Sequence, residues 1–70
     1  MKLTDAAELK PYLIKSINTN NEEVKNFLSS LGFVPGETVE IILKQRSGIV
    51  VLIKDARYSL DTKIAAAISI

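Results

Sequence analysis

The sequence predicts a small, mostly β domain, in which an antiparallel barrel of four to five short strands carries one inserted α-helix. Two patterns predict it. Val39, Ile41 and Leu43 alternate with Thr38, Glu40, Ile42 and Lys44, and Ala56, Tyr58 and Leu60 alternate with Arg57 and Ser59, a period of two that is typical of half-buried strands. Helical spacing of apolar residues is clear only over about residues 21–31. A chain of 70 residues allows one domain, residues 1–70, with one small core.

The helix is delimited by residues that cap its two ends. Asn20 and Glu23 have the spacing of a capping box, so Asn20 is expected to accept a hydrogen bond from the first turn. Gly32 stands where a left-handed residue ends a helix, and Phe33 is expected to pack back on Leu28. The apolar stripe between the caps is Val24, Phe27, Leu28 and Leu31.

Short strands and turns account for the rest of the chain. Residues 12–17 after Pro11 are expected to form one strand, with Tyr12 and Ile14 on one face. Residues 49–53 and 56–60 form two further strands. The turns between strands are expected at residues 46–48, where Gly48 supplies a positive φ, and at residues 55–56. A short helical turn at residues 64–67, capped by Asp61 or Thr62, precedes a last strand that pairs with the first.

The residue types exclude most catalytic chemistry. The chain has no cysteine and no histidine, which removes most nucleophiles, redox groups and ligands for Zn²⁺ or Fe²⁺. Glu22 and Glu23 are adjacent, and adjacent helical side chains point about 100° apart, so they do not share a ligand site. The sequence therefore predicts no catalytic residue, no metal ligand and no cofactor, and hence no enzyme.

Charge and hydropathy exclude two further classes. Nine basic against eight acidic residues give no basic excess for phosphate contacts, so nucleic-acid binding is not expected. No apolar run approaches the roughly 18 residues of a membrane span, and Asp5 comes too early for a signal peptide. We expect a cytoplasmic protein that does not insert into the membrane. A small RNA-binding barrel is the least favoured alternative.

One candidate partner surface follows from strand alternation. If Val39, Ile41 and Leu43 face inward, Ile42 faces outward. The strand at residues 49–53 is expected to pair with the strand that contains Tyr58 and Leu60. If Tyr58 and Leu60 face inward, this pairing leaves Val50 and Leu52 facing outward as well. Three clustered aliphatic side chains, Ile42, Val50 and Leu52, favour a contact surface. Coverage of these residues by residues 1–10 or by the helix is an equally open alternative, because periodicity does not place the helix.

The helix end and the following strand carry a recognisable motif. The run Leu31-Gly32-Phe33-Val34-Pro35-Gly36-Glu37-Thr38-Val39-Glu40-Ile41 resembles the LG-(L/F/M)-x-PG-x-x-V-x-V signature of FeoA domains. Arg57-x-x-Leu60 and Ile68-x-Ile70 follow in the family's order, and the resemblance covers about residues 10–70. Within the signature, capping and turn chemistry explains Leu31, Gly32, Pro35 and Gly36, so we assign them structural roles.

The resemblance implies an SH3-like barrel with a helical insertion, and a cytosolic accessory protein of ferrous-iron uptake. The implied partner is the membrane permease FeoB, which carries a cytosolic GTPase domain, would handle the iron itself and would recruit this protein to the inner face of the membrane. The basic residues Lys44, Arg46, Lys54 and Arg57 are interpreted as solvated turn residues. The resemblance makes Arg57 the exception and adds it to the candidate surface. The alternative is a free-standing SH3-like module that oligomerises or binds another partner.

Overall fold

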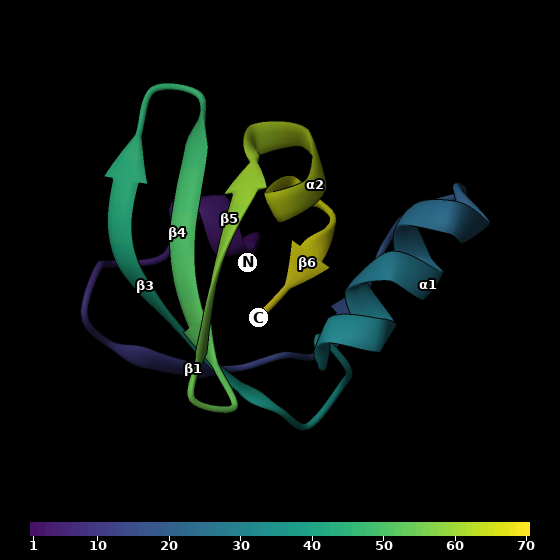
Figure 1. Cartoon of the computed structure of the whole chain (residues 1–70), viewed down its shortest axis with the longest axis horizontal. Coiled ribbons are helices and arrows are strands. Elements are labelled where there is room, and N and C mark those ends of the chain that lie inside the picture. The colour runs from purple at the N-terminus through teal and green to yellow at the C-terminus, as the bar shows by residue number, and fades with distance from the viewer.

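A computed structural model describes all 70 residues and contains two antiparallel sheets, one longer helix and one short helix (Figure 1). The order of strands in the larger sheet is β1-β3-β4-β5, and β2 pairs with β6. The predicted mostly β fold, with one inserted helix and a C-terminal helical turn, is confirmed. The elements are a 3₁₀ turn η1 (Leu3–Asp5), β1 (Pro11–Leu13), β2 (Ser16–Ile17), α1 (Glu22–Leu31), β3 (Thr38–Gln45), β4 (Gly48–Ile53), β5 (Ala56–Asp61), α2 (Thr62–Ala66) and β6 (Ile68–Ser69).

The expected first strand is two strands that belong to different sheets. β1 pairs with β3 and β2 pairs with β6, and the chain turns between them at Ile14 and Lys15. The Ile14 N–H donates to the Glu37 carbonyl at 2.9 Å, whereas the Lys15 N–H donates to the Ser69 carbonyl at 2.7 Å. The corner therefore moves the chain from the large sheet to the small one, which confirms the expected pairing of the last strand with the first.

The termini of the chain lie together beside this small sheet. The Ile70 N–H donates to the Met1 carbonyl at 2.7 Å, and the Met1 ammonium lies 3.2 Å from the Ile70 carbonyl. Lys2 and Ser69 also form an isolated antiparallel β-bridge. Residues from the two ends of the chain are thus joined by backbone hydrogen bonds.

Helix α1 begins one residue later than expected. Its N-cap is Asn21, whose side chain accepts from the N–H groups of Glu23 at 3.0 Å and Val24 at 3.3 Å. The expected capping role of Asn20 is therefore wrong. The Thr19 hydroxyl accepts the N–H of Asn21 at 3.1 Å, and this local turn places the second of the two asparagines at the cap.

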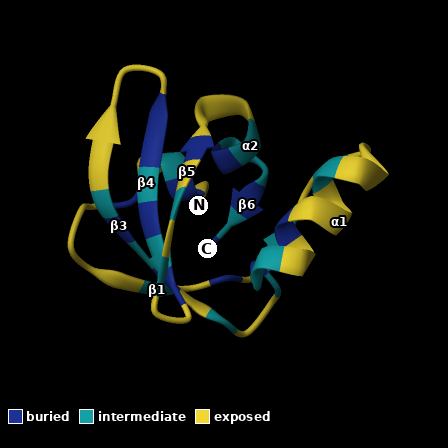
Figure 2. Cartoon of the chain, in the orientation of Figure 1, coloured by how far each residue is buried: buried dark blue, intermediate teal, exposed yellow.

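The other end of α1 matches the expectation. Gly32 has a φ of 104°; its N–H donates to Ser29 O at 3.0 Å and the Phe33 N–H donates to Leu28 O at 2.9 Å. This pair of bonds defines a Schellman motif. Leu28 is buried, but Phe27 of the expected stripe is 49% exposed. The helix packs on the core mainly through its C-terminal end, and most of its surface faces solvent (Figure 2).

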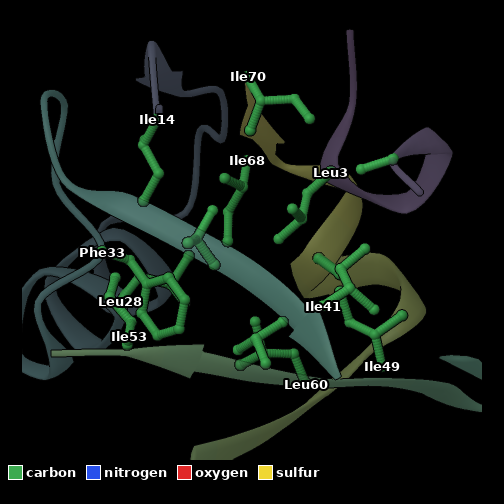
Figure 3. Packing of buried hydrophobic residues seen from close by; sticks show 14 residues of the cluster. Leu3, Ile14, Leu28, Phe33, Ile41, Ile49, Ile53, Leu60, Ile68 and Ile70 are labelled. Carbon is green, nitrogen blue, oxygen red and sulfur yellow. The ribbon is translucent and has the colours of Figure 1, made fainter. Parts of the chain in front are cut away.

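The core is aliphatic, as the composition predicts. All buried side chains are apolar, and Phe33 is the only aromatic residue among them; its ring lies edge-on to that of half-buried Tyr58, with centroids 5.9 Å apart. Leu28, Phe33 and Ile53 group at one end of the core (Figure 3). The cluster comprises Leu3, Ala6, Ile14, Leu28, Phe33, Val39, Ile41, Ile49, Val51, Ile53, Leu60, Ala65, Ile68 and Ile70.

A β-bulge in β3 changes the predicted direction of one side chain. Ile41 pairs with Val51, but the next paired residue of β3 is Leu43, which pairs with Val50. Ile42 and Leu43 therefore oppose a single residue, as in a bulge. The expectation that Leu43 faces inward is wrong: its side chain is 46% exposed. One extra residue shifts the period of two from that point onward.

The two hairpin turns also differ from the expectation. Gly48 begins β4 and is not among the residues with positive φ. A Cβ there would lie 2.1 Å from the Leu60 carbonyl oxygen, so glycine is required by the close approach of β5. In the second turn, Lys54 and Asp55 have φ of 48° and 64°, the signs of a type I′ turn, so that reversal lies one residue earlier than expected.

Helix α2 is capped by Asp61, one of the two expected residues. Its Oδ1 accepts the Ile64 N–H at 2.8 Å. Ala65 faces the core, so this short helix covers one end of the barrel and turns the chain from β5 into β6 (Figure 1).

Candidate interaction surface

The side of the large sheet that faces away from the core is the candidate surface. Cross-strand partners lie on the same face of a sheet, and Val39, Ile41, Val51 and Ile53 are buried on the inner side. Their neighbours along each strand therefore point outward. We call this surface the outer face and define it by its apolar and charged residues: Leu13, Glu40, Ile42, Leu43, Val50, Leu52 and Arg57.

The strand register places these residues in rows across the sheet. Leu52 of β4 pairs with Glu40 of β3 on one side and with Arg57 of β5 on the other. In the next row, Val50 pairs with Leu43 on one side and Ser59 on the other. The bulge adds Ile42 beside Leu43. The sheet thus brings together the four residues expected as a partner surface, Ile42, Val50, Leu52 and Arg57.

The apolar part of the outer face is accessible to different degrees. Ile42, Val50 and Leu52 are half-buried, while Leu13 is 61% and Leu43 is 46% exposed. Strand alternation could have identified Leu13, because it stands between Tyr12 and Ile14, which were expected to share the opposite face. Leu43 could not be found in this way, because the sequence does not show the bulge.

Neither the N-terminal segment nor α1 pairs across the outer face. The segment before β1 runs along the edge of β3: the Leu9 N–H donates to the Ile41 carbonyl at 2.8 Å, and Glu8 Oε2 accepts the Lys44 N–H at 2.7 Å. In Figure 1, α1 stands at the right of the picture, beyond β6 and on the side opposite β3. The N-terminal segment thus flanks β3, and α1 comes near the sheet through Phe27, which lines a hollow with Ser59 and Asp61 of β5.

On either side of Leu52, the outer face carries an acidic and a basic side chain that make no ion pair within the chain. The only ion pair joins Lys54 Nζ and Glu37 Oε1 at 3.5 Å. Glu40 is half-buried and Arg57 is exposed. Their charges are therefore available to groups outside the chain.

The four basic residues near the hairpin turns do not form one patch. Lys44 and Arg46 lie at the β3–β4 turn, whereas Lys54 lies at the β4–β5 turn, at the other end of β4. Six residues of strand, about 20 Å, separate the two turns. Arg57 stands apart from the other three because it alone pairs with an apolar residue of the outer face, Leu52.

The four signature residues that were assigned structural roles, Leu31, Gly32, Pro35 and Gly36, lie outside the outer face. Gly32 ends α1, and Gly36 has a φ of 93° and donates its N–H to the Ile14 carbonyl at 2.9 Å. A Cβ at Gly36 would meet no atom within 4 Å, so the requirement there is conformational. Pro35 and Gly36 turn the chain from the helix into β3, and Leu31 is half-buried beside the core.

Comparison with known families shows which family the chain belongs to. The family model described as the FeoA domain matches residues 1–70. The chain belongs to the FeoA family. This family serves as an accessory of ferrous-iron transport and is not a known enzyme family. A search of curated protein sequences finds no significant match.

Solved structures of FeoA proteins share this fold. The chain is similar to Stenotrophomonas maltophilia FeoA, a prokaryotic SH3 domain protein complexed with zinc, at 23% identity and a TM-score of 0.87, covering 99% of this chain and 87% of that one. It is also similar to iron(II) transport protein A from Clostridium thermocellum, at 31% identity and a TM-score of 0.89, covering 99% of this chain and 43% of that one. The expected SH3-like fold is confirmed.

The same fold occurs in larger regulators. The chain is similar to IdeR of T. acidophilum at 24% identity and a TM-score of 0.85, covering 97% of this chain but 32% of that one. At this identity the likeness shows the fold alone.

No group of three or more His, Cys, Asp or Glu side chains converges to hold a metal ion. None of the helices has both the length and the apolar character that crossing a bilayer requires.

Proposed function

We propose that this FeoA domain is a cytosolic adaptor that binds a FeoB-type ferrous-iron permease and modulates it. In this proposal the outer face is the contact surface, and the permease recruits the domain to the inner face of the membrane. The observation that carries the proposal is the juxtaposition on one face of exposed Leu13 and Leu43 with Arg57, a cation that has no partner within the chain.

The composition of the outer face supports a protein partner. Its centre is aliphatic and its charges lie beside that centre, which is the arrangement of a protein–protein contact with an apolar core and a polar rim. The aliphatic residues come from the hydrogen-bonded neighbouring strands β1, β3 and β4, so a partner would meet a rigid surface that needs little ordering on binding. GTP hydrolysis and iron transfer remain with the permease, and the domain acts by binding.

The test is a titration of the isotope-labelled domain with the soluble cytosolic domain of the permease from the same organism, followed by NMR with and without a GTP analogue. We expect shifts confined to the outer face, centred on Ile42, Val50, Leu52 and Arg57. Shifts confined to another face would refute this surface. An absence of shifts at high micromolar concentrations of partner would instead favour a module that binds something else.

A matched pair of variants tests the surface. Leu43→Asp and Phe27→Asp both replace a large apolar side chain of similar exposure, 46% and 49%, but only Leu43 belongs to the outer face. We expect Leu43→Asp to weaken binding of the permease domain about tenfold or more, because an interface centre tolerates a buried charge poorly, and Phe27→Asp to leave it unchanged. Equal effects of the two variants would contradict the proposal.

A further inference from the structure

We propose that the outer face also binds a second copy of this chain, in a two-fold symmetric dimer in which Glu40 of each copy faces Arg57 of the other. This inference concerns the isolated protein and does not rest on binding of the permease. Its structural basis is a set of three neighbouring residues in one row of the sheet, Glu40, Leu52 and Arg57.

The row is acidic on one side of β4, apolar at β4 and basic on the other side, and beyond Glu40 it continues to the uncharged Pro11 of β1. Neighbouring strands lie about 4.8 Å apart, so Glu40 on β3 and Arg57 on β5 stand at nearly equal distances on either side of Leu52 on β4. Neither charge has an ion-pair partner in its own chain, since the only ion pair joins Lys54 and Glu37.

Such a row is complementary to itself. Consider two outer faces stacked against each other and related by a two-fold axis that runs along β4, midway between the faces. This operation places Leu52 on Leu52 and exchanges the two sides of the row, so each Glu40 meets the Arg57 of the other copy. One contact thus forms two ion pairs, as an isologous interface requires. Stacked sheets lie about 10 Å apart, a gap that a glutamate and an arginine side chain can span together.

The neighbouring row fits the same axis. Val50, between Leu43 and Ser59, would meet the Val50 of the second copy. Exposed Leu43 would then lie over Ser59, whose small side chain leaves room for it. The axis therefore pairs a large side chain with a small one and each charge with its opposite.

The size of the outer face indicates a weak dimer. Four strands span about 15–20 Å, and β4 is about 20 Å long, so the contact is smaller than the roughly 800 Å² per partner of a standard interface. We therefore expect reversible association at high micromolar concentrations. The second copy would occupy the surface proposed for the permease, so self-association and permease binding would compete.

Charge exchange provides the test. Sedimentation equilibrium of the full chain alone, from low micromolar to low millimolar concentration, would compare the natural sequence with Glu40→Arg, Arg57→Glu and the double variant. Each single variant places like charges opposite each other twice, so we expect the dimer dissociation constant to rise about tenfold or more. The double variant restores the alternation of charge and should associate like the natural sequence.

The two single variants also complement each other. Mixed in equal amounts, a copy with two arginines faces a copy with two glutamates, so we expect a heterodimer although neither variant associates alone; its formation also shows that both variants are folded. Glu22→Arg is the control, because it changes the net charge as Glu40→Arg does but lies at an exposed position of α1. It should leave the dimer dissociation constant unchanged.

Three results would overturn the proposal: a natural sequence that stays monomeric over the whole range, single variants that associate as well as it does, or a double variant and a mixture that both fail to associate. Because no permease is present, each of these results leaves the proposed adaptor function untouched. A failed permease titration, in turn, leaves the dimer standing.

Discussion

Gly32 has a backbone conformation that most residues adopt only with strain. At a φ of 104° a side chain is disfavoured, and a Cβ would in addition lie 3.2 Å from Cδ of Lys54. We expect Gly32→Val to lower the free energy of unfolding by roughly 1 kcal/mol or more, because a β-branched residue tolerates positive φ least. Thermal unfolding measures the loss. Gly32→Asn is the matched control and should lose less, since asparagine adopts left-handed conformations more readily. An unchanged melting temperature in Gly32→Val would contradict this account of the cap.

Two adjacent asparagines precede α1, and only the second caps it. Asn21→Ala removes the acceptor of the Glu23 and Val24 N–H groups, so we expect a loss of about 1 kcal/mol in chemical denaturation. Asn20 makes no side-chain hydrogen bond to the helix, and Asn20→Ala should change stability by less than about half of that. A larger loss of stability in Asn20→Ala than in Asn21→Ala would instead indicate that Asn20 is the N-cap, as the capping-box spacing predicts.

At the scale of single elements, β4 and β5 approach so closely at Gly48 that a side chain cannot fit. A Cβ at this position would lie 2.1 Å from the Leu60 carbonyl oxygen, and the obstacle is backbone. Gly48→Ala should therefore destabilise the protein by about 2 kcal/mol or more, because the two strands must separate to admit a methyl group. Gly36→Ala is the control, since it adds the same methyl group at a position with open space. Its loss of stability should come only from the positive φ of that residue. Denaturant midpoints compare the two, and equal losses would contradict a steric role for Gly48.

The elements also show where prediction from the sequence ends. Both caps of α1 involve residue types with strong local preferences, so its bounds were predicted to within a residue. The bulge at Ile42 and Leu43 has no such local signal, since both residues suit a strand on either face. Its consequence, the outward position of Leu43, follows only from the pairing with β4. The corner at Ile14 and Lys15 is likewise set by two partners distant in sequence, Glu37 and Ser69.

For the molecule as a whole, the fold class and the core were more predictable than the site. An aliphatic core follows from composition, and an SH3-like barrel follows from the resemblance carried by Gly32, Pro35 and Gly36. The candidate surface was predicted through Ile42, Val50 and Leu52, because alternation in β4 depends only on which face is inside. Glu40 was missed as a part of that surface. Its place there depends on its position across β4 from Arg57, and sequence alone does not give the register of three strands.

The meeting of Met1 and Ile70 has a consequence for the entropy of the unfolded chain. Their backbones already exchange hydrogen bonds, so a short flexible peptide could join them covalently with little change in the folded state. A circular chain has fewer unfolded conformations than an open one, and the loss scales with the logarithm of the loop length. Cyclisation would thus stabilise the domain without altering a single residue of the outer face. The fold offers engineers a means to strengthen the scaffold and test its surface separately.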